Sequence, residues 1–335
     1  MSRIGIRLLS TIPTLFGVIL VTFLLTRVLP GDPAVFFASN PSMTQADIEA
    51  VRTSLGLDRP LIVQFWLYLK ALLHGDLGNS LSTGQKVTTE FANRLPASAE
   101  LTIFAFVIAT AVALPLGVIA ALRRGSFIDH LSRLIATLGV SMPTFVTGLL
   151  LIFFFYFLIG WAPEPIGRLD PFMFEPERVT GLYTVDALLA GDLELFWAAL
   201  KQMVLPAVTM ALFALAPLTR MARASMLETL GSEFIRTARA AGLSRRKIIV
   251  TYAFRNAMLP VVTTMGMTFS YMLGANVLVE RVFSWPGVGA FAIDSIINLD
   301  YAPLQGFMLV MAGIFILVNL TTDILITLID PRSSL

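Results

Sequence analysis

An uncharged stretch of 22 residues, Leu101–Leu122 (LTIFAFVIATAVALPLGVIAAL), decides the class of fold. A helix rises about 1.5 Å per residue, so about 20 apolar residues cross the hydrocarbon core of a bilayer. Five further apolar runs have a similar character, although Pro206 and Pro217 interrupt the fourth. The sequence therefore predicts an all-α integral membrane protein with six transmembrane helices, at Leu8–Leu29, Leu101–Leu122, Leu134–Gly160, Met203–Thr219, Leu259–Val279 and Leu304–Ile329.

The composition of the whole chain agrees with this prediction. Of the 335 residues, 56% are hydrophobic and only 14% are charged, and the mean hydropathy is +0.79. An ordinary soluble domain has about 25% charged residues. Lipid must therefore cover much of the apolar surface, which excludes a cytosolic enzyme and a disordered chain. Cysteine is absent and the two histidines, His74 and His130, lie far apart, so no metal site is expected.

The charges of the loops predict the orientation of the spans. Loop 123–133 carries three basic residues against one acid, and loop 220–258 carries eight against two. Segment 161–202 has the opposite bias, with three basic residues and seven acids. Because lysine and arginine mark cytoplasmic loops, the two basic loops and both termini are predicted to be cytoplasmic. All four tryptophans then fall on the outer side, where this residue anchors helices at the membrane interface: Trp66, Trp161, Trp197 and Trp285.

This topology divides the chain into three parts. Residues 1–29 form the cytoplasmic N-terminus and the first span, which we interpret as an uncleaved helix because the run is too long for a signal peptide. Residues 30–98 form an external segment with two short helices, whose ends are predicted at Gly56 and Gly75. Residues 99–335 form a core of five spans that contains the cytoplasmic loop 220–258.

Loop 220–258 has the pattern of a helical hairpin. The first helix is predicted from about Ser225 to Ala241, and Gly242 can take the left-handed conformation that ends it. Ser244 is placed to cap a second helix that runs to about Met258, after which Pro260 opens the fifth span. A hairpin with small residues and arginines can dock into a groove on another protein. The competing interpretation is that the arginines serve only to fix the membrane topology.

Two features of this hairpin favour docking. Four residues of its first helix are predicted to form one apolar patch: Phe234, Ile235, Ala238 and Ala241. Arg236 and Arg239 lie three residues apart and therefore on neighbouring positions of one face.

The hairpin also carries a resemblance to a known family. The stretch Arg236-Thr237-Ala238-x-x-x-Gly242, followed by Leu259-Pro260, resembles the E-A-A-x-x-x-G…L-P loop of ABC importer permeases. Arg236 stands where the general pattern has glutamate, and the distance to Leu259-Pro260 is longer than in sugar-type permeases. Both departures are similar to the dipeptide/oligopeptide branch, and so are motifs along nearly the whole chain: Leu29-Pro30-Gly31-Asp32-Pro33, Leu55-Gly56-Leu57-Asp58-Arg59-Pro60-Leu61, Gly75-Asp76-Leu77-Gly78-Asn79-Ser80, Arg94-Leu95-Pro96-Ala97, Pro115-Leu116-Gly117-Val118, Phe283-Ser284-Trp285-Pro286-Gly287-Val288-Gly289 and Asp330-Pro331-Arg332.

The resemblance is to the first (B-type) inner-membrane subunit of such importers, and segment Arg178–Lys201 is most like the dipeptide and glutathione members. It implies a multi-pass protein of the bacterial cytoplasmic membrane that works with a second permease, two cytoplasmic ATPases and an external peptide-binding protein. The chain contains no G-x-x-x-x-G-K-[ST] phosphate loop, so ATP is expected on the partners and no cofactor on this chain. The resemblance also implies ATPase-coupling residues: Glu233, Phe234, Ile235, Arg236, Ala238, Arg239, Ala241, Gly242 and Leu243.

Two further sets of candidate residues concern the substrate path. Polar or adaptable residues within the third and fifth spans are candidates to line it: Ser141, Thr144, Thr263, Thr264, Met267, Ser270 and Asn276. The proline- and glycine-containing bend after the fifth span is a candidate outer gate or binding-protein contact: Arg281, Trp285, Pro286 and Gly287. Packing between helices, or anchoring of Trp285 in the lipid interface, would explain the same residues without such roles.

A peptide importer, with dipeptides as the leading substrate, is the function that the sequence favours. Glutathione, heme or a metal chelate are alternative cargoes for the same architecture. A secondary transporter would be expected to show an inverted repeat and paired intramembrane charges, and neither is evident. A membrane enzyme would need a cluster of catalytic groups, whereas the histidines are isolated. No nucleic acid partner is expected.

Overall fold

The computed structural model describes residues 3–28, 44–54 and 56–329. Within these ranges the regular structure is helical, and no β-strand occurs apart from one isolated bridge between Asn79 and Lys86. The Gly31-Asp32-Pro33 and Asp330-Pro331-Arg332 motifs lie outside the described residues. The chain forms two compact units, residues 1–96 with 286–316 and residues 97–285 with 317–335, and each is considered by itself.

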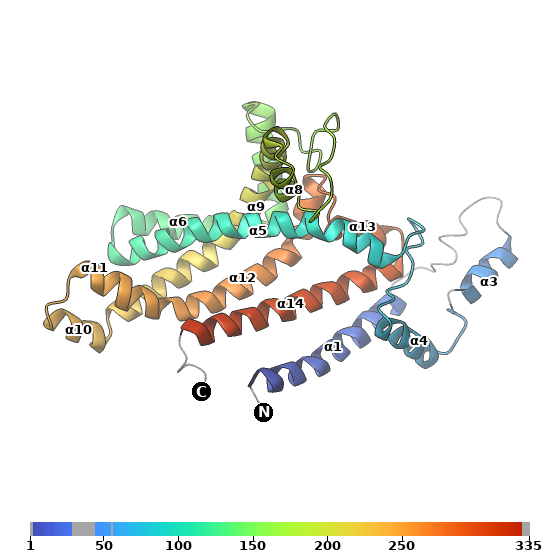
Figure 1. The fold of residues 1–335 in the computed structure, drawn as a ribbon, viewed down its shortest axis with the longest axis horizontal. Coiled ribbons are helices and arrows are strands. Elements are labelled where there is room, and N and C mark those ends of the chain that lie inside the picture. Colours follow the sequence, from blue (N-terminus) through green and yellow to red (C-terminus); the bar gives the residue numbers. More distant parts are fainter. Residues whose placement is uncertain (1–2, 29–43, 55, 330–335) are drawn as a thin grey trace. The chain divides into compact units, whose positions relative to one another are not determined.

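The helices of the first unit come from both ends of the chain (Figure 1). They include α1 (Arg3–Val28), α3 (Gln45–Ser54), α4 (Leu61–Leu73) and α13 (Val288–Ile297). Gly56 and Gly75 follow α3 and α4 with positive φ angles, which confirms the predicted helix ends. Phe23 of α1 packs against Phe65 of α4 with the ring centroids 5.2 Å apart, so α4 lies on α1.

The second unit contains most of the long helices. Two helices are shared between the units, namely α5 (Val87–Leu122) and α14 (Tyr301–Ile329). The others are α6 (Phe127–Ser141), α7 (Thr144–Leu151), the π-helical turn η1 (Ile152–Leu158), α8 (Tyr183–Leu189), α9 (Leu193–Leu230), α10 (Glu233–Ala240), α11 (Arg245–Lys247), the π-helical turn η2 (Ile248–Phe254) and α12 (Arg255–Val282). Within this unit α10 and α11 lie at one end of α9 and α8 lies near the other (Figure 1).

Four helical stretches among the described residues are long and apolar enough to cross a membrane: Val87–Leu122, Leu193–Leu230, Arg245–Gly274 and Tyr301–Ile329. The predicted fourth span was too short, because Pro206 and Pro217 lie inside α9 without ending it. The predicted third span is divided at Met142-Pro143 into α6 and the stretch Thr144–Leu158. Proline has no amide hydrogen to continue the helix, which accounts for this division.

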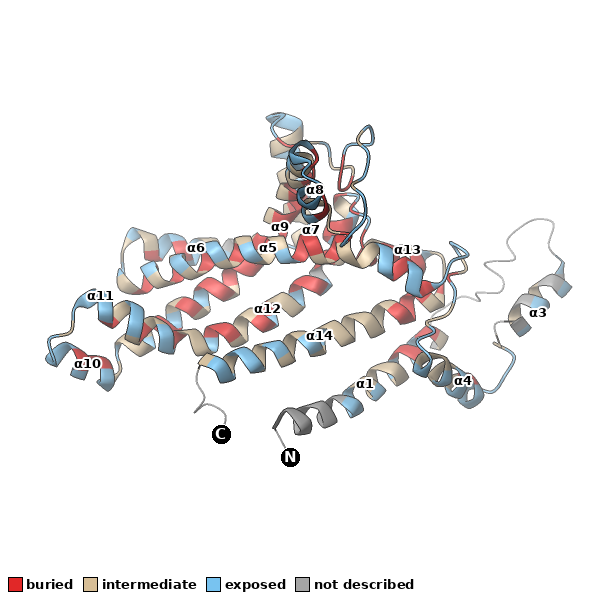
Figure 2. Ribbon diagram, in the orientation of Figure 1, coloured by how far each residue is buried: buried red, intermediate tan, exposed pale blue. Residues whose placement is uncertain are grey.

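Helix α9 is the centre of the second unit, and buried residues follow it along most of its length (Figure 2). Its neighbours include α6, α7, α8 and α12. Small residues allow this close packing. A Cβ atom at Gly117 of α5 would lie 2.7 Å from the Cβ of Ala222, and one at Gly139 of α6 would lie 2.6 Å from the carbonyl oxygen of Leu212.

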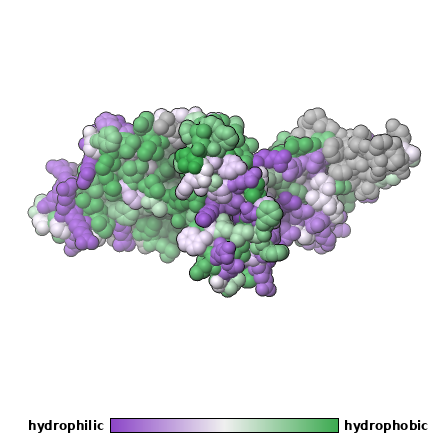
Figure 3. All heavy atoms as spheres, turned by 90° about the horizontal axis from the view of Figure 1, so that it is seen from above, coloured by the Kyte–Doolittle hydropathy of each residue, from purple (hydrophilic) through white to green (hydrophobic). Residues whose placement is uncertain are grey.

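The surface of the second unit matches the needs of a membrane protein. Large hydrophobic side chains are exposed along its long helices, among them Val107 of α5, Leu149 of α7 and Tyr271 of α12. The face shown in Figure 3 has a broad hydrophobic area, and hydrophilic side chains gather at the end where α10 and α11 lie. Lipid can cover the hydrophobic area, and water can cover the hydrophilic end.

Candidate functional site

The hairpin is built differently from its predicted form. Helix α9 continues to Leu230 and ends at Gly231. Helix α10 then begins at Glu233. The predicted single helix from Ser225 to Ala241 was therefore wrong. The Gly231-Ser232 pair was the available signal, since glycine ends helices and serine favours the position before a new one.

Gly242 ends α10 as predicted. Its φ angle is 73°, and its amide hydrogen bonds to the carbonyl of Arg239 at 3.0 Å, while the amide of Leu243 bonds to Ala238 at 3.2 Å. These two bonds are the Schellman arrangement, which requires a left-handed residue at this position. A Cβ atom at Gly242 would meet nothing within 4 Å, so backbone conformation alone favours glycine here.

The second arm of the hairpin is joined to the fifth span. Ser244 caps it, with Oγ accepting a hydrogen bond from the amide of Lys247 at 3.4 Å. The chain then runs through α11, η2 and α12 to Val282 with Pro260 inside α12. The prediction that this arm ends near Met258 and that Pro260 opens the span was wrong, because α12 begins at Arg255 and continues through Pro260 without a break.

The apolar residues of α10 do not form one patch. Ile235 is completely buried and Ala238 is 7% exposed, and both pack against Met226 of α9 and Ile248 of η2. Phe234 is 44% exposed, and Ala241 is also exposed. The inner side of α10 therefore holds the hairpin together, and only its outer side offers Phe234 and Ala241 to another molecule.

The two arginines of α10 also have different surroundings. Arg236 forms an exposed ion pair with Glu233 at 2.6 Å. Arg239 lines a pocket between α10 and its neighbours, and its Nη2 atom donates to the carbonyl oxygen of Leu230 at 3.5 Å. Both arginines are exposed, but Arg236 pairs with an acid on its own helix, whereas Arg239 reaches back to the last turn of α9.

A buried carboxylate at the start of α6 ties the C-terminal part of α9 in place. Asp129 is 1% exposed, and Arg223 donates to its two oxygens at 2.6 and 3.0 Å. The hydrogen bond from Arg223, helped by the backbone amide of Gly125, holds the pKa of Asp129 well below its usual value. Sequence reasoning assigned both residues to topology alone, because no local pattern shows that residues 94 positions apart will pair.

The candidate path residues are placed on different surfaces. Ser141 and Met267 are exposed, and Thr144, Thr263, Thr264 and Ser270 are half-buried. The hydroxyls of Thr263, Thr264 and Ser270 donate hydrogen bonds to carbonyls one turn earlier in α12. These bonds lie within one helix and do not join α12 to another. Met267 at 55% and Tyr271 at 70% exposure form the open part of the α12 surface.

Asn276 is the exception among the candidate path residues. Its side chain is 2% exposed and donates to the carbonyl of Ser98 at 3.3 Å and to the hydroxyl of Thr102 at 3.1 Å. The nearby Ser98 hydroxyl donates to the buried carboxylate of Glu280 at 2.5 Å. Asn276 therefore joins α12 to α5 and does not face a path.

Trp285 is also buried, which contradicts its predicted anchoring in the lipid interface. Its ring nitrogen donates to the carbonyl of Ala97 at 2.9 Å, and the side chain is 2% exposed. Ser284, with φ at 52°, turns the chain so that the Trp285 amide bonds back to Glu280 at 2.7 Å. Gly287 is buried, which leaves Arg281 and Pro286 exposed in this bend.

Segment 161–192 contains a second polar cluster that the sequence did not reveal. Arg168 donates to Glu100 of α5 at 2.6 Å and to the carbonyl of Gly181 at 2.8 Å, and its guanidinium lies 3.4 Å from the centre of the Tyr183 ring. Thr184 donates to the other oxygen of Glu100 from both its amide and its hydroxyl. These bonds hold residues 161–192, which we call the outer cap, on α5.

Asp186 organises the interior of the outer cap. Burial opposes its charge, but hydrogen bonds from the hydroxyl and amide of Thr180 and the amide of Gly181 outweigh that effect and lower its pKa. The cap is therefore a defined structure rather than a loose loop.

Comparisons with known proteins extend over the hairpin, the core and the outer segment. The family described as "Binding-protein-dependent transport system inner membrane component" matches residues 113–335, and the corresponding N-terminal family matches residues 1–102. The chain is 40% identical to the dipeptide transport system permease protein DppB of Escherichia coli K12 over 97% of this chain and 96% of the relative. It is 42% identical to the di/tripeptide transport system permease protein DppB of Pseudomonas aeruginosa over 99% and 98% of the two chains. For the dipeptide permease DppB of Haemophilus influenzae the identity is 41% over 97% of each.

Proposed function

The chain belongs to the family of binding-protein-dependent transport system inner membrane components, and we propose that it is the first permease subunit of an ATP-driven dipeptide importer. It is a multi-pass protein of the bacterial inner membrane. The observation that carries the proposal is the similarity to named dipeptide permeases, which covers nearly the whole length of both proteins. A substrate class shared by relatives at this identity is the best guide, because the fold alone supports many cargoes.

Six spans with both termini in the cytoplasm are part of this proposal. The spans lie within α1, α5, the α6–η1 stretch, α9, α12 and α14, whose ends extend beyond the membrane. The bias of basic residues towards loops 123–133 and 220–258 supports the orientation. The apolar parts Ile12–Arg27 and Thr144–Leu158 are shorter than the four long spans, but the helices that contain or adjoin them supply further length.

The hairpin is the element that couples this subunit to an ATPase. Phe234 of α10 and Ala241, which directly follows this helix, are exposed and offer an apolar contact, with the Arg236–Glu233 pair beside them. Ile235 and Ala238 anchor α10 to α9 and η2. When the ATPases close on ATP and carry α10 with them, this packed junction transmits the movement into α9 and α12.

The substrate path lies against the exposed side of α12. Met267 and Tyr271 are the most exposed large side chains near the middle of this helix. A flexible thioether and an amphipathic ring suit peptides with varied side chains. The second permease subunit forms the other wall, and an external binding protein delivers the peptide near the outer cap and the Arg281 bend.

Purification of the intact complex tests this function. The protein extracted in mild detergent should bring down a second permease and two ATP-binding subunits, and ATP hydrolysis in liposomes should rise when binding protein and dipeptide are added together. Binding protein with glutathione, heme or a metal chelate serves as the matched control and should give no rise. Transport by the purified chain alone under an ion gradient would contradict the proposal and identify a secondary transporter.

A further inference from the structure

The hairpin and the ends of α5 and α9 line an open pocket that combines apolar side chains with two arginines. Its volume is about 430 Å³, within the range of about 300–1,000 Å³ that is common for small-molecule sites. Six of the lining residues are apolar and two are arginines: Ala121, Leu122, Leu230, Leu243, Ile248, Ile249, Arg239 and Arg245. No acidic residue lines it.

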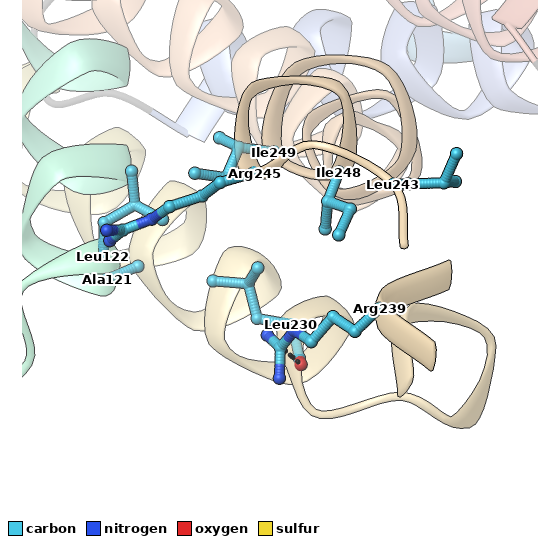
Figure 4. A pocket seen from close by; sticks show the side chains of 8 residues that line it. All are labelled: Ala121, Leu122, Leu230, Arg239, Leu243, Arg245, Ile248 and Ile249. Carbon is cyan, nitrogen blue, oxygen red and sulfur yellow. Dashed lines mark hydrogen bonds between the residues drawn. The ribbon is translucent and has the colours of Figure 1, made fainter. Parts of the chain in front are cut away.

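The two arginines approach this pocket from different elements. Figure 4 shows Arg239 reaching from α10 towards Leu230, and Arg245 reaching from α11 towards Leu122 and Ala121 at the end of α5. Among the residues that the structure describes, neither arginine has a carboxylate within ion-pair distance. By contrast, Arg236 and Arg223 are both paired with acids. The two guanidinium groups are thus available to an anion.

The position of the pocket indicates which anion. Leu122 is the last residue of α5 and of the apolar run that crosses the membrane, and Arg123 and Arg124 follow it directly. In the proposed topology this level is that of the cytoplasmic headgroups. A ligand here meets an apolar wall formed by Leu122, Ile248 and Ile249 and a positive rim, which is the chemistry of an anionic phospholipid.

We propose that this pocket binds one anionic phospholipid, with its phosphate held by Arg239 and Arg245 and the start of its acyl chains against the apolar wall. The bound lipid would join the end of α5 to both arms of the hairpin and stiffen the element that meets the ATPase. This inference rests on the cytoplasmic placement of the hairpin in the proposed function. It does not depend on the identity of the transported substrate.

Lipid retention by purified protein tests the site. The complex is incorporated into nanodiscs that contain phosphatidylglycerol or phosphatidylcholine, re-extracted, washed, and analysed for bound lipid by native mass spectrometry. Wild type should retain phosphatidylglycerol in preference to phosphatidylcholine, and addition of inorganic phosphate alone should not displace it. Arg239→Gln and Arg245→Gln should each lower retention by about fivefold, as expected for one basic residue at an anionic surface.

Two control variants keep the test decisive. Arg236→Gln removes a charge from the same helix outside the pocket and should retain the lipid, and the Arg239→Lys/Arg245→Lys double variant keeps both charges and should retain most of it. Equal retention by the glutamine variants and wild type would overturn the proposal, as would equal retention of both lipids. Loss of ATP-binding subunits from the glutamine variants with unchanged lipid would instead assign the arginines to a protein partner.

The lipid measurement and the function can fail separately. If lipid retention follows the two arginines but no ATP-binding subunit ever copurifies, the lipid site stands and the proposed function falls. If the ATPases copurify but lipid retention is the same with and without the two arginines, the proposed function stands and the lipid site falls.

Discussion

Replacement of Arg168 by methionine should destabilise the protein by about 3–5 kcal/mol, which is the usual cost of removing one partner of a buried ion pair. The substitution leaves the Glu100 carboxylate, which is 6% exposed, without its counter-charge. It also removes the hydrogen bond to Gly181 and the stacking on Tyr183. The outer cap should therefore loosen from α5. Thermal unfolding in detergent and the rate of protease cleavage within residues 161–192 measure the effect.

The double variant Arg168→Met/Glu100→Gln is the control for this prediction. Removing both charges leaves no unpaired ion, so it should recover a large part of the lost stability. Lys201→Met removes an exposed charge from α9 and should have little effect. A single Arg168→Met variant as stable and as protease-resistant as wild type would show that the ion pair does not hold the cap.

Replacement of Gly117 by leucine should also destabilise the protein, by separating α5 from α9. A Cβ atom at this position would lie 2.7 Å from the Cβ of Ala222 and 2.8 Å from the carbonyl oxygen of Thr219. Backbone atoms of α9 cannot rotate away, so α5 and α9 must separate, at a cost of about 1–3 kcal/mol or more. The separation also displaces Arg223, whose amide nitrogen would be 3.1 Å from the new atom. We expect the variant to accumulate poorly in the membrane, and the fraction that does accumulate to take up little dipeptide.

Gly313→Leu is the matched control, since a Cβ atom there meets nothing within 4 Å. It should accumulate in the membrane like wild type. Normal abundance, unfolding temperature and uptake in the Gly117→Leu variant would show that α5 and α9 do not pack as closely as described.

The apolar runs made the helical class of this protein predictable, because the long apolar runs within the described residues are helical. Residues that set helix ends through their own backbone were also predictable: Gly56, Gly75 and Gly242 all have the positive φ angles expected of them. Proline was a less reliable guide to where helices end. Pro143 separates two helices, whereas Pro206 and Pro217 lie inside one.

The interactions that hold the site were not predictable from the sequence. Asp129 pairs with Arg223, and Glu100 with Arg168, across 94 and 68 positions. No periodicity reports such pairs, since they depend on how helices pack in three dimensions. The same limitation explains why Trp285 and Asn276 were assigned to surfaces. Their polar groups suggested contact with solvent or substrate, but each finds a hydrogen-bond partner on α5.

Site-specific crosslinking from α10 tests the docking of the hairpin most directly. Because the chain contains no cysteine, Phe234→Cys and Ala241→Cys each introduce a single reactive thiol, and Ile62→Cys on the exposed surface of α4 is the control. A photoactivated thiol-linked probe is attached in membranes, and its adducts are identified by mass spectrometry. We expect adducts with an ATP-binding subunit from positions 234 and 241 and none from position 62. Uptake-competent variants whose α10 probes label only lipid would contradict it.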